Sequence, residues 1–153
     1  MDNIYKMSIE DYDKVKTIYQ KTYDMHADKR NDIFNKVDSL SIDYYKELIT
    51  NAICLVYKEE KELLGFIIAK ENKSKDIPEL KQRTTYFIEV LGVDEKHTRK
   101  GIGKKLYQAL KAEAKKKSID AIELNVWSFN QSAIEFYKNL GLKLKSSIYE
   151  DKL

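Results

Sequence analysis

The stretch YFIEVLGVDEKHTRKGIGKKLYQAL, residues 86–110, decides how the chain folds. It begins with an apolar run that is typical of a buried strand, and apolar residues then recur on one stripe of a helix predicted to begin near Lys100. The turn between them holds Gly101 and Gly103, with cations on both sides. The first N–H groups of a helix have no partner within the helix, and glycine lets a ligand approach the backbone. This turn is therefore suited to bind a phosphate or diphosphate.

Two familiar phosphate-binding patterns do not fit this turn. A dinucleotide fingerprint requires a third glycine at position 106, which is Leu106, and a P-loop requires Ser or Thr where Lys105 stands. The residues alone leave two interpretations open. The turn either binds an anion with charge from Lys100, Lys104 and Lys105, or is a tight connection with a solvated cationic rim.

Residues before this stretch predict two helices, joined by an irregular connector, between strands. Residues 3–8 alternate as a short strand, Ser8 and Asp11 form a capping box, and helical spacing continues to about Ala27. Ser41 is expected to cap a second helix over residues 42–51. Residues 52–73 read as a hairpin that turns at 60–61, and residues 74–85 as a loop.

Residues after it add a strand over 121–127, a helix capped by Asn130, and a last strand from Leu142 to about Tyr149. The predicted order is strand, two helices, three strands, helix, strand, helix and strand. Consecutive strands followed by helical crossovers predict an α/β (α+β) fold with a mixed sheet and helices on both faces.

Composition limits the classes of function. The chain has 153 residues, enough for one domain, and a net charge of only +3 with three arginines, so a nucleic-acid partner is not expected. Cys54 is the single cysteine and neither histidine has partners at metal-ligand spacing, so we expect no disulfide and no metal. No signal peptide and no run of about 18 apolar residues occurs, which predicts a cytoplasmic protein without a membrane partner.

The same stretch, followed by LNVWSFNQSAIEFYKNLGLK at residues 124–143, resembles the GNAT superfamily of acyl-CoA-dependent N-acetyltransferases. The resemblance rests on two motifs in the family's order and spacing, between residues 86 and 145. It implies that residues 1–153 form a single GNAT-type domain with a mostly antiparallel twisted sheet of about six to seven strands. It also implies acetyl-CoA as cosubstrate, and direct attack by a primary amine without an acetyl-enzyme.

The resemblance assigns roles to residues of both motifs. Leu91 and Val93 would offer backbone groups to the acyl-pantetheine arm, and Asn130 would hydrogen-bond the pantetheine region. Tyr137 would lie near the thioester sulfur. The residues implied around the diphosphate are Arg99, Lys100, Gly101, Ile102, Gly103 and Lys104. Two positions depart from the family: Thr98 replaces Gln or Arg, which predicts weaker charge assistance, and Leu142 replaces Phe.

Acetyl transfer to an amine requires a proton acceptor, because an amine with a pKa of about 10.4 is almost fully protonated at pH 7. Glu89 lies inside the apolar strand, where partial burial would raise its pKa, so it is the candidate base. Alternatively Glu89 faces solvent or pairs with a lysine, and Glu123 or Asn125 orients a water that relays the proton. Tyr137 is either a core aromatic residue or the group that hydrogen-bonds the departing sulfur.

The acceptor in this family usually lies between the first two helices and the later strands. The resemblance thus implies that Tyr23, His26 and Phe34 line the acceptor site, with Arg30 and Asp32 of the same stretch as further candidates. The acceptor expected is a small amine, such as an aminoglycoside or polyamine, or a protein N-terminus or lysine. A non-catalytic acyl-CoA-binding module with the same fold is the alternative function, and either a monomer or a homodimer is compatible with the sequence.

Overall fold

A computed structural model of the chain describes residues 2–153. The elements in chain order are β1 (Ile4–Lys6), η1 (Ile9–Asp11), α1 (Tyr12–Lys29), α2 (Ile42–Asn51), β2 (Ile53–Glu59), β3 (Glu62–Lys73), β4 (Thr84–Val93), η2 (Glu95–His97), α3 (Ile102–Lys116), β5 (Ala121–Leu124) and α4 (Gln131–Asn139). Here η1 and η2 are single turns of 3-10 helix. All of the predicted helices and all but one of the predicted strands are present.

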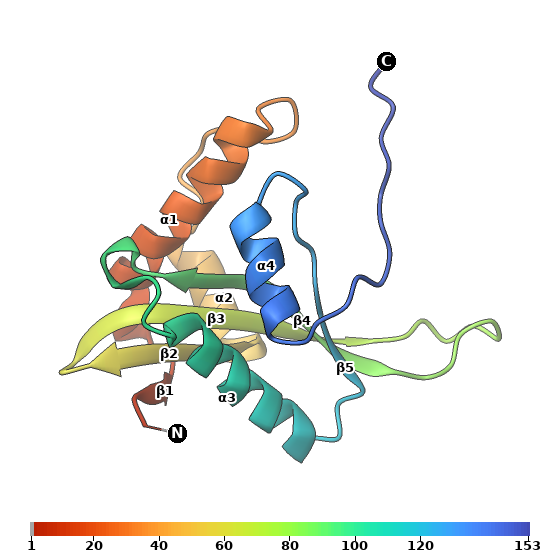
Figure 1. Cartoon of the computed structure of the whole chain (residues 1–153). Helices are drawn as coiled ribbons and strands as arrows, with labels where there is room; N and C mark the ends of the chain where they lie inside the picture. The colour runs from red at the N-terminus through yellow and green to blue at the C-terminus, as the bar shows by residue number, and fades with distance from the viewer. Residues whose placement is uncertain (1) are drawn as a thin grey trace.

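The strands form one sheet in the order β1-β2-β3-β4-β5. The first four are antiparallel and only β4 and β5 are parallel, as expected for a mixed, mostly antiparallel sheet. The sheet has five strands rather than six or seven, because the strand predicted from Leu142 to Tyr149 is not formed. That segment leaves the body of the molecule as an extended arm, which Figure 1 shows in blue at the C-terminus.

Helices cover both faces of the sheet, which confirms the predicted layering. On one face α1 and α2 pack Val15, Ile18 and Leu48 against Phe66 and Ile68 of β3. On the other face Ile102, Leu106 and Leu110 of α3 pack against the side chains of alternate residues of β3 and β4 (Ile67, Ala69, Tyr86 and Ile88). In Figure 1, α3 crosses in front of the sheet and α2 lies behind it. Because β3 is buried on both faces, it reads as a continuous apolar run rather than as an alternating one.

Local sequence signals explain how the elements begin and turn. The Asp11 carboxylate accepts a hydrogen bond of 2.9 Å from the Ser8 N–H just before α1. Ser41 Oγ accepts from the Tyr44 N–H at 3.2 Å and so caps α2. Glu60 and Lys61 have φ of 47° and 71°, the two positive angles of a tight hairpin turn. Among the described residues, no helix is both long and apolar enough to cross a membrane.

Candidate active site

The sheet opens between β4 and β5. The parallel ladder runs from Thr85 opposite Ala121 to Ile88 opposite Leu124, and there it stops. Beyond it the chain after β5 turns away from β4 (Figure 1), so residues 89–93 of β4 lack a neighbouring strand on that side. Backbone groups on this side of Leu91 and Val93 are consequently available to a ligand, as the resemblance implied for these two residues.

A β-bulge lies where this opening begins. Ile68 pairs with Val90 and the next residue, Ala69, pairs with Ile88, so Glu89 is the extra residue of β4. Bulges interrupt the ladder and re-aim a side chain. Here Glu89 turns toward the α1 and α2 face, where its carboxylate lies 3.7 Å from Lys70 Nζ. Lys70 Nζ in turn donates to Tyr44 Oη at 3.4 Å.

The side chain of Glu89 is only partly buried. Its side chain is 39 % exposed and pairs with a lysine, which is the alternative that the sequence left open. The bulge places Glu89 and Val90 on the same face, where Val90 packs against the core under α1 and α2 and Glu89 reaches Lys70. Tyr19 of α1 lies close enough for the Glu89 charge to add to the effect of burial, and both raise the pKa of the Tyr19 phenol.

The glycine turn presents unpaired backbone donors. Arg99 and Gly101 have positive φ values of 66° and 76°, on either side of Lys100. Alternating left-handed residues form a concave nest of N–H groups. Across residues 2–153, no described group accepts a hydrogen bond from the N–H of any residue from 99 to 104. The first bond of this region is donated by the Lys105 N–H to the Gly101 carbonyl at 3.0 Å.

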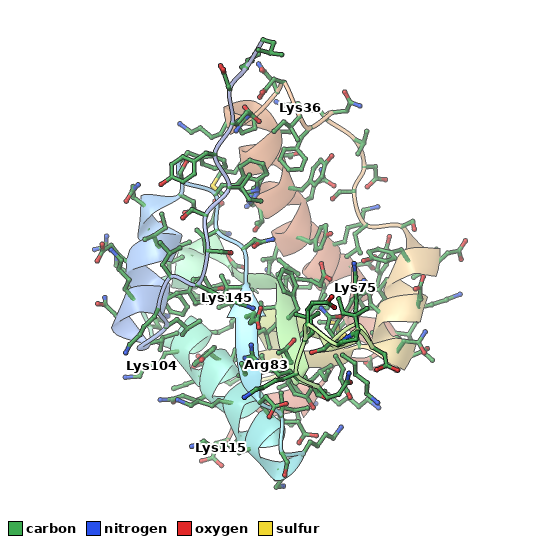
Figure 2. All side chains as sticks on the ribbon, turned by 90° about the vertical axis from the view of Figure 1, so that its right-hand side faces the viewer. Lys36, Lys75, Arg83, Lys104, Lys115 and Lys145 are labelled. Atoms are coloured by element: carbon green, nitrogen blue, oxygen red, sulfur yellow. The ribbon has the colours of Figure 1, made fainter. Side chains whose placement is uncertain are left out.

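Lysine side chains around the turn differ in their directions. Lys100 Nζ lies 3.2 Å from His97 Nδ1, and Lys104 is exposed at the start of α3, where Figure 2 labels it. Lys105 instead reaches Tyr57 on β2, with Nζ 3.3 Å from the phenol oxygen and 5.2 Å from the ring centroid. Of the three lysines considered for the turn, Lys105 is therefore directed away from it, toward β2.

Helix α4 closes the opening next to the glycine turn. A Cβ on Gly103 would lie 3.1 Å from Phe136 Cζ and 3.8 Å from Leu91 Cδ2, so the end of β4, the start of α3 and α4 meet there. Tyr137 follows Phe136, with ring centroids 5.0 Å apart. Burial raises the pKa of the Tyr137 phenol to about 12. Asn130 Oδ1 accepts from the Ala133 N–H at 3.2 Å and thereby caps α4.

The three residues expected at the acceptor site lie together in an aromatic cluster. Phe34 packs edge-on against Tyr23 and His26, with centroids 6.2 and 6.0 Å away. The loop after β5 completes the cluster: Trp127 lies 5.6 Å from Phe34, and Phe129 lies 5.7 Å from His26. Trp127 and Phe129 were not among the predicted site residues, although the aromatic pair just before the Asn130 cap was a signal for them.

Arg30 contacts both this aromatic cluster and a neighbouring carboxylate. Its guanidinium carbon lies 5.3 Å from the Trp127 ring centroid, and two of its nitrogens donate to the two carboxylate oxygens of Asp32 at 2.9 and 2.8 Å. This pairing lowers the pKa of Asp32 to about 2. The cluster therefore combines ring faces, a fixed cation and a fixed carboxylate.

On the α1 side of the β4 terminus lies a pocket of about 330 Å³. Its lining shares only Val93 with the predicted site. Asp94 at its rim is buried, forms an ion pair with Lys14 of α1, and accepts from the Lys96 N–H at 3.0 Å. These contacts, the Lys14 hydrogen bond foremost, lower the pKa of the Asp94 carboxyl. Asp94 thus fixes the start of the loop that carries the glycine turn. No group of three or more metal-ligating side chains occurs among the described residues.

Comparison with known proteins identifies one matching family. Residues 12–142 match the family model described as Acetyltransferase (GNAT) family. No curated protein sequence shows a significant match. A crystal structure of a mutant BH1408 protein from Bacillus halodurans is 27 % identical, with 98 % of each chain covered and a TM-score of 0.95.

Two further solved structures are similar in fold. A ribosomal-protein-alanine N-acetyltransferase from Brucella melitensis biovar Abortus 2308 is 18 % identical over 98 % of this chain and 99 % of that chain, with a TM-score of 0.70. An aminoglycoside N-acetyltransferase, AAC(6')-Iy in complex with CoA, is 14 % identical over 97 % of this chain and 93 % of that chain, with a TM-score of 0.76.

Proposed function

Because the chain belongs to the GNAT acetyltransferase family, we propose that it moves an acetyl group from acetyl-CoA to a primary amine. The observation that carries the proposal is the row of unpaired N–H groups over residues 99–104, beside the opening between β4 and β5. Unpaired donors at a helix start are a binding site for a diphosphate. Arg99, Lys100 and Lys104 would add positive charge, while Gly101, Ile102 and Gly103 leave room for close approach of the ligand.

The opening suits the rest of acetyl-CoA. A pantetheine arm laid along β4 would pair with backbone groups of Leu91 and Val93, which have no strand partner on that side. The carboxamide NH2 of Asn130 donates no hydrogen bond to a described residue, so it would donate to an amide oxygen of that arm. The thioester would then lie near the Glu89 bulge and Tyr137.

The transfer itself is a direct substitution at the thioester carbonyl. The amine nitrogen forms a bond to the carbonyl carbon, the C–S bond breaks, and the sulfur leaves with the electron pair. Glu89, directly or through a water held with Glu123 or Asn125, would take the proton that the amine loses. The Tyr137 hydroxyl would donate a hydrogen bond to the developing thiolate.

The acceptor would bind at the aromatic cluster. Tyr23, His26 and Phe34 supply ring surface at the end of α1, and Phe129 and Trp127 supply it from the loop after β5. Ring faces attract ammonium groups, so an amine acceptor fits this surface. We keep both acceptor classes, a small amine and a protein amine, and propose that residues 1–153 act as a single domain.

Thermal melting with matched ligands tests the proposal. At 100 times its Kd, acetyl-CoA should add about 2.7 kcal/mol to the free energy of unfolding. Acetyl-pantetheine, which lacks the diphosphate, is the control and should stabilise far less. An unmoved melting curve with acetyl-CoA would refute both the transferase and the alternative, a non-catalytic acyl-CoA-binding module.

Measurement of turnover distinguishes the acetyltransferase from the non-catalytic acyl-CoA-binding module. A panel of amines, assayed by release of free thiol from acetyl-CoA, should give sustained turnover with at least one acceptor. Tight acetyl-CoA binding with only trace thiol release across the panel would instead favour the non-catalytic module.

A further inference from the structure

The side chain of Lys70 places a primary amine beside the proposed base. Residues of β3 alternate across the sheet: Phe66 and Ile68 pack under α1 and α2, so Lys70, two residues further on, faces the same side. Glu89, the extra residue of the bulge, faces this side as well, and its carboxylate forms an ion pair with Lys70 Nζ at 3.7 Å. The register of the strands sets this contact, because Lys70 pairs with Phe87, two residues before Glu89.

Tyrosines of both helices surround the Lys70 ammonium. Nζ donates to Tyr44 Oη of α2 at 3.4 Å and lies 5.7 Å from the centroid of that ring. On α1, burial and then the charge of Glu89 raise the pKa of the Tyr19 phenol, while the charge of Lys70 lowers it. Tyr23 follows Tyr19 by four residues on α1 and belongs to the aromatic cluster. The Lys70 amine therefore lies at the end of the proposed acceptor surface that is nearest Glu89.

These contacts are the ones that an acceptor amine requires. A primary ammonium must give a proton to a base before it can attack a thioester, and a second polar group must orient it. Lys70 has both partners in Glu89 and Tyr44. Its side chain is 40 % exposed, so the amine is not enclosed by other residues. Because the thioester is proposed to lie at the Glu89 bulge, an amine held against Glu89 is also held near the reacting carbon.

We propose that this protein acetylates its own Lys70 when acetyl-CoA is bound and no acceptor is present. The inference rests on the proposed function, because it uses the same thioester and the same base. The Lys70 ammonium first gives a proton to the Glu89 carboxylate. Nζ then forms a bond to the thioester carbonyl carbon, the C–S bond breaks, and the sulfur leaves with the electron pair. The nitrogen loses its second proton to the thiolate, Glu89 returns its proton to solvent, and the products are Nζ-acetyl-lysine and coenzyme A.

The charge of Lys70 makes this reaction slow and gives it a consequence. Burial opposes the charge, but the hydrogen bond to Tyr44 and the charges of Glu89 and Glu47 outweigh burial and raise the pKa of the ammonium. Only a small fraction of Lys70 is therefore neutral at pH 7, and acetylation should proceed slowly to one acetyl group per chain. An acetylated Lys70 has no charge, so its ion pair with Glu89 is lost and the place beside the base becomes free of a competing ammonium.

Peptide mass spectrometry of the full-length protein, after incubation with acetyl-CoA, tests the proposal. Lys70 should be acetylated at least about tenfold faster than Lys73, an exposed lysine at the end of the same strand. Acetyl-pantetheine at equal concentration carries the same thioester without the diphosphate, and should acetylate Lys70 at least about tenfold more slowly. The rate with acetyl-CoA should saturate, and it should not depend on protein concentration, because the reaction occurs within one chain.

Three variants identify the base and the acceptor atom. Glu89→Gln should slow acetylation of Lys70 at least about tenfold and leave Lys73 unaffected. Its side chain is 39 % exposed, so the fold should persist in the circular dichroism spectrum. Glu71→Gln, at an exposed neighbour on β3, is the matched control and should leave both rates unchanged. Lys70→Arg keeps the positive charge and should carry one acetyl group fewer per chain.

Several outcomes would overturn the proposal. They are equal acetylation of Lys70 and Lys73, acetylation of Lys70 that is unaffected by Glu89→Gln, and a rate that rises with protein concentration. If acetyl-CoA raises the melting temperature and an added amine is turned over while Lys70 stays unmodified, this inference alone fails. If melting, turnover and Lys70 all show no response to acetyl-CoA, the proposed function fails with it.

Discussion

Removal of the Tyr137 hydroxyl tests how the departing sulfur is stabilised. Burial raises the pKa of this phenol to about 12. An ordinary thiol has a pKa of about 8.5, so full proton transfer from the phenol to the thiolate would be uphill by about 4.8 kcal/mol, at 1.36 kcal/mol for each pKa unit. We therefore propose that the phenol would act mainly as a hydrogen-bond donor, a contribution of about 1.5–3 kcal/mol when the acceptor is charged. Tyr137→Phe should lower kcat about 10- to 160-fold.

Steady-state kinetics with acetyl-CoA and a saturating amine measure this effect, with thiol release as the signal. The KM for acetyl-CoA should change little, because the hydrogen bond forms only as charge develops on sulfur. Tyr107→Phe removes the hydroxyl of a neighbouring buried tyrosine and is the matched control, with kcat expected to stay at the wild-type value. An unchanged kcat for Tyr137→Phe would refute the role. A loss beyond about 10⁴-fold would show that Tyr137 transfers its proton outright.

Three further substitutions test the proposed base, the glycine turn and the loop that begins at Asp94. Glu89→Gln should lower kcat about 10²-fold, while Glu71→Gln should not; equal rates would exclude Glu89 as base. Gly103→Val places a branched side chain against Phe136 and into the turn. The added side chain would keep the diphosphate away from one backbone N–H of the turn and so remove one charge-assisted hydrogen bond. The Kd for acetyl-CoA, measured by calorimetry, should therefore rise at least about tenfold. Asp94 has a pKa below its ordinary 3.8, so its ion pair with α1 stabilises the fold above that pH. Asp94→Asn should lower the melting temperature at pH 7, and the difference should shrink as the pH falls through the lowered pKa; a constant difference would contradict this.

Much of the fold could be predicted because its signals are local. The apolar run before the glycine turn, the Ser8–Asp11 and Ser41 caps, and the Glu60-Lys61 hairpin turn each depend on a few adjacent residues. The structure forms each of them at the expected place. The family motifs added the order of the later elements.

Features that depend on two distant segments escaped prediction. Glu89 reads as a strand residue, and its place in a bulge becomes evident only from the register of β3 against β4. Trp127 packs against Phe34 and Phe129 packs against His26, each across more than ninety positions of sequence, so no local pattern pairs them. Residues 142–149 have the alternating pattern of a strand, yet a strand forms only where it pairs with another strand, and this segment pairs with no described strand.

The brevity of the β4–β5 ladder has a consequence for the lifetime of the protein. Only four paired positions join β5 to the described sheet, and none of the residues of α4 is fully buried. Partial opening of the sheet between β4 and β5 therefore breaks the fewest contacts. Proteases should first cut the chain there. Acetyl-CoA bound between β4 and β5 would contact both β4 and α4 and so stabilise the closed arrangement. Degradation in the cell should then slow when acetyl-CoA is abundant and quicken when it is scarce.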